Sequence, residues 1–214
     1  MSDRTSRRQF LLGAGGFAAA SATIAACGGD KKRTGPTTET TVGPTGSLSG
    51  DLQIAALAAS LENLTAATYQ MGLDNAAANK LGAVPPAVVT YFQTAKRHHE
   101  EHAAAWNAIL TSAGKTRVTD PDLTLKPQID QAFAQVRDFF GLARLALSME
   151  NVAAATYLSG IGAIQNNQAL KTAASIHPVE MQHAAVLNFM LGNDPAPDGF
   201  AKTEGARPPS DYPG

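Results

Sequence analysis

The chain has 214 residues, of which 44% are hydrophobic, 16% charged and only 6% aromatic, and its formal net charge is −1. This length suits one domain with additional segments, and the alanine-rich, aromatic-poor composition favours helices over sheets. No basic block follows residue 33, which argues against nucleic acid as a partner, and the single cysteine excludes a disulfide within the chain.

Residues 1–26 are predicted to be an export signal that is not part of the fold. The segment from Ser6 to Leu12 resembles the twin-arginine signal, and the apolar stretch after it is shorter than the ~20 strongly apolar residues of a membrane span. Ile-Ala-Ala before Cys27 resembles a lipobox, so lipid attachment is expected at Cys27. The alternative is a short N-terminal membrane helix with an incidental cysteine.

Residues 27–48 are rich in Gly, Thr, Pro and Ser, and they are predicted to form a flexible linker behind the lipidated cysteine. These features together predict a domain exported by the twin-arginine route. Its lipid would hold it at the outer face of the cytoplasmic membrane or in the cell envelope.

Residues 49–192 are predicted to form an all-α bundle of four helices without strands. Pro85 and Pro86 suit a first helical turn, whereas Gly114 and Gly192 suit left-handed helix ends. Residues 115–126 are expected to be a loop, and residues 193–214 an irregular tail. The expected helices cover residues 51–79, 85–114, 127–165 and 167–191.

An internal repeat divides the bundle into two helical hairpins. Residues 60–73 (SLENLTAATYQMGL) and 148–161 (SMENVAAATYLSGI) are identical at eight of fourteen positions. Two such hairpins can close around a pseudo-two-fold axis. If that axis lies across the bundle, the second and third helices are parallel and their link must cross over the length of the bundle.

The repeat places one glutamate on an apolar face of each hairpin. Glu62 and Glu150 lie among alanines, and Tyr69 and Tyr157 follow them by seven residues on nearly the same helix face. A carboxylate is expensive to bury alone, so a shared cationic metal pair between the helices would explain both. Alternatively, both glutamates are surface residues and the repeat reflects duplicated packing.

Histidines occupy the other helix of each hairpin. Glu180 and His183 form a Glu-x-x-His pattern, which projects both side chains from one helix face. In the first hairpin, His102 is equivalent to His183. The position equivalent to Glu180 holds His99 instead of a glutamate. Imidazole and carboxylate ligands together suit iron or manganese.

These residues resemble the ferritin-like superfamily, particularly exported bacterial ferritin-like domain proteins. The resemblance covers residues 50–192 and implies a di-iron or Fe/Mn centre held by one glutamate from each of two helices and Glu-x-x-His from the other two. Five of the six family ligands are present, and His99 is the departure. The implied ligands are Glu62, His99, His102, Glu150, Glu180 and His183, with Tyr69 and Tyr157 orienting carboxylates or carrying a proton or an electron.

The sequence thus predicts an envelope protein that oxidises ferrous iron or reduces oxygen or peroxide, as a monomer or a homodimer. The alternative is a non-catalytic ferritin-like lipoprotein with a vestigial metal-free site, acting as a binding or scaffold module.

Overall fold

The computed structural model describes residues 48–212, and all regular structure in that range is helical. The predicted signal peptide, Cys27 and residues 27–47 of the predicted linker lie outside the described residues. The prediction of an all-helical bundle is confirmed, and no described helix is long and apolar enough to cross a membrane. The described helices are α2 (Asp51–Ala77), α3 (Pro86–Ser112), α4 (Lys126–Ala134), α5 (Phe139–Ile161), α6 (Asn167–Met190) and the 3-10 helix η1 (Pro209–Asp211).

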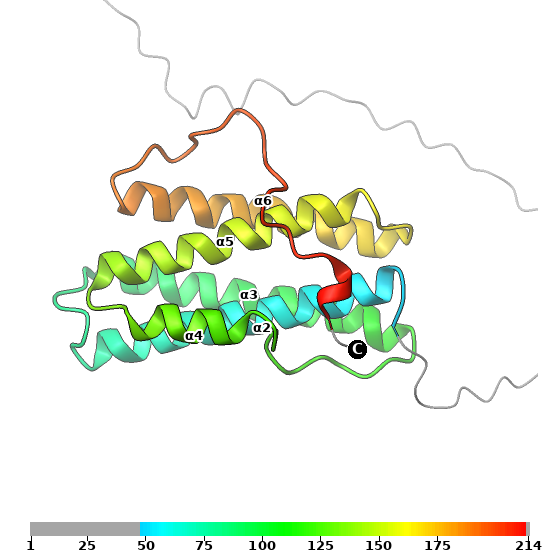
Figure 1. The fold of residues 1–214 in the computed structure, drawn as a ribbon, viewed down its shortest axis with the longest axis horizontal. Coiled ribbons are helices and arrows are strands. Elements are labelled where there is room, and N and C mark those ends of the chain that lie inside the picture. Colours follow the sequence, from blue (N-terminus) through cyan, green and yellow to red (C-terminus); the bar gives the residue numbers. More distant parts are fainter. Residues whose placement is uncertain (1–47, 213–214) are drawn as a thin grey trace, which may run out of the picture. The chain divides into compact units, whose positions relative to one another are not determined.

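The four long helices form the two hairpins that the repeat predicts. Helix α2 packs mainly on α3, and α5 packs mainly on α6. Figure 1 shows α3 and α5 running in the same direction, so the link between them crosses the length of the bundle. The predicted crossover is therefore present.

The expected single helix over residues 127–165 is wrong, because the chain forms α4, breaks, and restarts as α5. Asp138 adopts an extended conformation (φ −148°, ψ 173°), and its side chain accepts a hydrogen bond from the backbone N–H of Gly141 at 2.7 Å. This N-cap starts a new helix rather than continuing the old one. The crossover consequently covers residues 113–138 and includes α4, which makes the link longer than the predicted loop.

The crossover is attached to the long helices at several residues, among them Val118, Asp122 and Ile129. The amide of Asn107 bonds both the N–H and the carbonyl of Val118, at 2.7 and 2.9 Å. Further on, the N–H of Asp122 donates to the carbonyl of Ser60 at 2.9 Å, and Ile129 of α4 packs against Leu64 of α2. These contacts attach the crossover to α3 and α2.

Two apolar clusters fill the bundle on either side of its middle. One contains Trp106 and Leu110 of α3, and the other contains Phe92 of α3 and Leu142 of α5. In all four long helices the glutamates and histidines singled out above lie between residues of the two clusters. The polar residues therefore occupy a layer across the centre of the bundle, between the two apolar clusters.

Candidate metal centre

The structure brings together all six side chains that the sequence predicts as metal ligands. Glu62 comes from α2, His99 and His102 from α3, Glu150 from α5, and Glu180 and His183 from α6. All are buried except His102, whose side chain is 11% exposed. Ligand atoms of Glu62, His99, His102 and Glu180 lie within 4.8 Å of one another, as do those of His99, Glu150, Glu180 and His183.

Small residues allow the helices to approach at this layer. Glu62 follows the buried alanines Ala58 and Ala59, and Glu150 is followed by the buried Ala153 and Ala154. A helix that presents alanine occupies less space than one that presents leucine, so α2 and α5 bring their carboxylates to the same interior point. The neighbouring alanines make each glutamate expensive to bury alone, because they offer it no polar partner. The same alanines bring the glutamates close to the partners on the other helices.

His99 lies at the centre of the cluster and contacts carboxylates from both hairpins. Its Nδ1 is 2.6 Å from Glu62 Oε2, and its Nε2 is 3.2 Å from Glu150 Oε1. Glu180 Oε2 is farther away, at 3.9 Å from Nε2. Burial alone disfavours a charged imidazole, but the charges of Glu150 and Glu180 outweigh that effect and hold the pKa of His99 well above its usual value.

The other two histidines lie at hydrogen-bonding or slightly longer distances from carboxylates. His102 Nδ1 is 2.9 Å from Glu180 Oε1, and His183 Nδ1 is 3.4 Å from Glu180 Oε2 and 3.5 Å from Glu150 Oε2. None of these atoms makes a well-aligned hydrogen bond. Five buried polar atoms thus converge without satisfied partners, which is unusual for a protein interior. They are His102 Nδ1, His183 Nδ1, Glu150 Oε2 and both oxygens of Glu180.

The buried glutamates and histidines of the layer form ion pairs. Burial raises the pKa of Glu62, but hydrogen bonding and charge from His102 and His99 outweigh it and lower the pKa to about 2. Burial likewise opposes protonation of His102 and His183, yet neighbouring carboxylates raise the pKa of each to about 9. Burial raises the pKa of Glu180. In the metal-free protein at neutral pH, imidazolium groups therefore offset the carboxylates.

The two tyrosines hold the carboxylates of the opposite hairpin. Tyr69 of α2 donates to Glu150 Oε1 of α5 at 2.5 Å, and Tyr157 of α5 donates to Glu62 Oε1 of α2 at 2.5 Å. Burial and the neighbouring glutamates raise the pKa of both phenols well above the usual value, so both remain protonated donors. The shared helix face within each repeat identified these tyrosines but did not indicate that the pairs cross between hairpins.

Three further residues around the cluster were not predicted as part of the site. Trp106 donates to the hydroxyl of Tyr157 at 2.7 Å, Tyr91 donates to the carbonyl of His183 at 3.1 Å, and His98 Nδ1 lies 3.0 Å from His183 Nε2. Trp106 follows His99 by seven residues on the same face of α3, the spacing that relates Glu62 to Tyr69. That spacing was the available signal for Trp106. Neither Tyr91 nor His98 repeats in the other hairpin.

The residues present fit a pair of metal ions, although unequally. The two four-residue groups share His99 and Glu180, and a carboxylate has two oxygens with which to serve both. A neutral imidazole has only one free lone pair, so His99 can complete one group but not both. One position would thus have four protein ligands and the other three. Mixed nitrogen and oxygen donors of this kind suit iron and manganese.

Comparison with protein families gives a match to the ferritin-like domain over residues 50–193. Comparisons with curated proteins and with solved structures give no match. The matched segment contains the four long helices and the entire His/Glu cluster. Because the match spans well over half of the sequence, the chain belongs to the ferritin-like domain family.

Proposed function

We propose that this protein binds a pair of metal ions, iron or iron with manganese, between its hairpins and uses them to oxidise ferrous iron or to reduce oxygen or peroxide. The observation that carries the proposal is the convergence of unsatisfied polar atoms from His102, Glu150, Glu180 and His183 on one buried layer. A pair of bound metal ions would accept lone pairs from the carboxylates, and from His102 and His183 once these lose their Nδ1 protons, and would offset the buried carboxylate charge.

When bound, an iron pair supplies the one-electron steps that a protein side chain cannot readily provide. The chain itself supplies orientation. Tyr69 fixes Glu150 and Tyr157 fixes Glu62, each through a hydrogen bond to Oε1, and Trp106 fixes Tyr157 in turn. The apolar clusters on both sides limit the access of water to the layer, which strengthens the electrostatic interactions inside it.

The proposed setting is the outer side of the cytoplasmic membrane or the cell envelope, with a lipid on Cys27. This part of the proposal is supported by the twin-arginine-like and lipobox-like segments alone. Lipid attachment would appear as an acylated N-terminal peptide beginning at Cys27 in the mass spectrum of the mature protein, whereas an unmodified Cys27 would exclude it.

One observation favours a second function, that of a metal-free binding or scaffold module. His99 contacts Glu62 at 2.6 Å and Glu150 at 3.2 Å, so a protonated imidazole can neutralise the layer without a metal. In this hypothesis the protonated His99 supplies the positive charge that a metal ion would otherwise supply. The two functions make different predictions for iron binding by a His99→Glu variant.

We expect His99→Glu to bind ferrous iron at least about 10-fold more tightly than the wild type, because a competing cation is replaced by a carboxylate ligand. The same variant should be less stable than the wild type without metal, because it buries a fourth carboxylate and removes the central imidazolium. Iron titration and thermal unfolding with and without metal measure both effects.

His99→Gln is the matched control, since it removes the imidazole without adding a ligand charge. It should lose metal-free stability but gain less iron affinity than His99→Glu. If neither the wild type nor His99→Glu binds iron, the metal-pair proposal fails and the scaffold function is favoured.

A further inference from the structure

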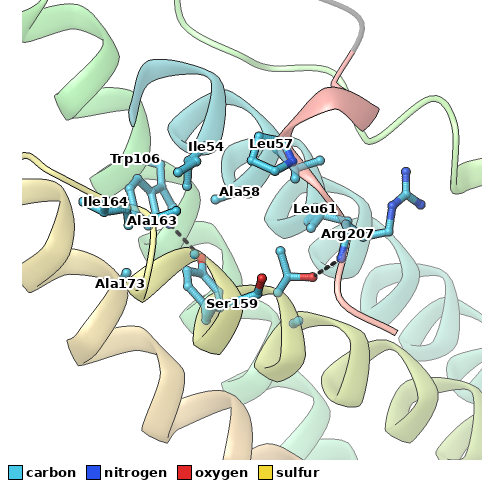
Figure 2. Close-up of a pocket in the computed structure, with 15 residues that line it drawn as sticks. Ile54, Leu57, Ala58, Leu61, Trp106, Ser159, Ala163, Ile164, Ala173 and Arg207 are labelled. Atoms are coloured by element: carbon cyan, nitrogen blue, oxygen red, sulfur yellow. Dashed lines mark hydrogen bonds between the residues drawn. The ribbon is translucent and has the colours of Figure 1, made fainter. Parts of the chain in front are cut away.

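An apolar cavity of about 60 Å³ lies beside the proposed metal centre, on the side of the Trp106 cluster. Figure 2 shows its walls converging from α2, α3, α5 and α6 and from the C-terminal segment around Arg207. Its exposed rim is formed by Ser159 and Ala163. Its lining includes Ile54, Leu57, Ala58, Trp106, Tyr157 and Gly160.

The polar groups on the inner wall of this cavity are already paired within the protein. The Tyr157 hydroxyl donates to Glu62 and accepts from Trp106. The Thr156 hydroxyl donates to the carbonyl of Val152 at 2.7 Å and accepts from the N–H of Arg207 at 2.9 Å. A buried water usually needs two to four polar partners. The inner wall offers few, so it favours an apolar occupant over water.

The size of the cavity limits that occupant to a molecule of a few atoms. An apolar cavity of about 150 Å³ holds benzene, whereas this one has less than half that volume. An aromatic ring or a long acyl chain is therefore too large. Peroxide and ferrous iron are polar or charged and would lose their hydration without gaining partners. Dioxygen is small, apolar and without such a requirement.

A single side chain separates the cavity from the carboxylates. The ring of Tyr157 lines the cavity, and its hydroxyl lies 2.5 Å from Glu62 Oε1 in the proposed metal centre. We propose that the cavity is a binding site for dioxygen, placed so that the molecule is held one tyrosine away from the metals. The purpose of the site rests on the proposed function, whereas binding of dioxygen or xenon in the cavity requires no metal.

Nuclear magnetic resonance of the metal-free full chain tests the proposal with two probes. Xenon should shift the methyl signals of Leu57, and dissolved dioxygen, which is paramagnetic, should relax those methyls faster than the methyls of Leu187. Leu57 is 2% exposed and lines the cavity, whereas Leu187 is 0% exposed in the other apolar cluster. Equal responses of Leu57 and Leu187 to both gases would overturn the proposal.

Ala58→Leu should abolish both responses, because the larger side chain fills the cavity. Ala155→Leu is the matched control, since Ala155 is also buried, at 3% exposed, but lines a separate groove formed by α5, α6 and the C-terminal tail. It should retain both responses, and their loss there would contradict a local site. If Ala58→Leu does not fold, Gly160→Ala is the milder variant, because its added Cβ would lie 3.7 Å from Ile54 Cγ2, and its responses should be reduced.

The outcome separates this inference from the proposed function. A chain that binds xenon and dioxygen at Leu57 but never binds iron would retain the cavity and lose the metal proposal. A chain that binds iron while Leu57 is insensitive to both gases would retain the metal centre and lose the cavity.

Discussion

Replacing Glu150 with alanine is expected to lower the free energy of unfolding of the metal-free protein by about 3–5 kcal/mol, because it removes one partner of a buried ion pair. The carboxylate is fully buried, lies 3.2 Å from His99 Nε2 and accepts the hydroxyl of Tyr69. Its loss leaves a buried imidazolium with weaker compensation and a buried phenol without its strongest acceptor. Chemical denaturation followed by circular dichroism measures the change. The iron content should fall to at most about one atom per chain, because Glu150 belongs to only one of the two ligand groups.

Glu101→Ala is the matched control for this variant. Glu101 is on α3 close to the cluster in sequence, but its side chain is 61% exposed and pairs with Arg97 on the surface. Removing it should cost at most about 1 kcal/mol, as for exposed ion pairs in general, and iron binding should be unchanged. Equal effects of the two substitutions would mean that Glu150 is not part of a paired buried layer.

Metal affinity should increase steeply with pH up to about 9. His102 and His183 have pKa values raised to about 9 in the metal-free protein, because nearby carboxylates outweigh burial. Each must lose a proton before its Nδ1 can bind a metal, so each contributes up to about tenfold in affinity per pH unit below that value. Titration with Mn²⁺, which oxidises less readily than ferrous iron, measures the slope. An affinity that is constant between pH 7 and 9 would contradict this account.

The stability of the metal-free protein should change with pH in the opposite direction over the same range. The contribution of His102 and His183 is fully present below their unfolded pKa of 6.5 and is lost as pH rises through about 9. That of Glu62 is present above 4.5 and is lost as pH falls towards about 2. Glu180 opposes this trend, because its raised pKa makes its ionisation unfavourable to folding. Stability should therefore be highest between about pH 4.5 and 6.5.

The repeat made the centre of the fold predictable from the sequence. A glutamate and a tyrosine seven residues apart occur twice, and a histidine recurs at the same place in each partner helix. Once two hairpins are assumed to pack symmetrically, these side chains must meet in the interior. The helix ends near Pro85, Gly114 and Gly192 are predictable within two residues for a different reason, because proline and glycine have strong local preferences at helix ends.

Features that depend on contacts between distant segments could not be predicted in the same way. The break before α5 is, by contrast, a local feature, the N-cap that Asp138 forms with the N–H of Gly141, which the helical pattern of residues 127–165 did not indicate. The crossed Tyr–Glu pairs depend on how the hairpins dock. The cavity depends on Arg207 and Pro209 of the tail reaching α5, and nothing in the local sequence of the tail specifies that path.

Position 99 determines how the centre differs from that expected for the family. A histidine there provides a cation when protonated and one ligand atom when neutral, but it cannot bridge two metals as a carboxylate can. The centre should therefore have two metal positions of unequal affinity. The tighter position is the one to which His99 contributes its single ligand atom. Its other ligands are Glu180 with either Glu62 and His102 or Glu150 and His183.

The most direct test of the account is the metal content of the full chain, purified without chelators or a polyhistidine tag and then loaded with ferrous iron without oxygen. Elemental analysis should find about two iron atoms per chain, the second binding more weakly than the first. Glu150→Ala should contain at most about one, because the group of Glu62, His99, His102 and Glu180 remains complete. A wild-type chain that contains no iron after loading would contradict the metal centre, and His99 would then be the cation that keeps the buried carboxylates in place.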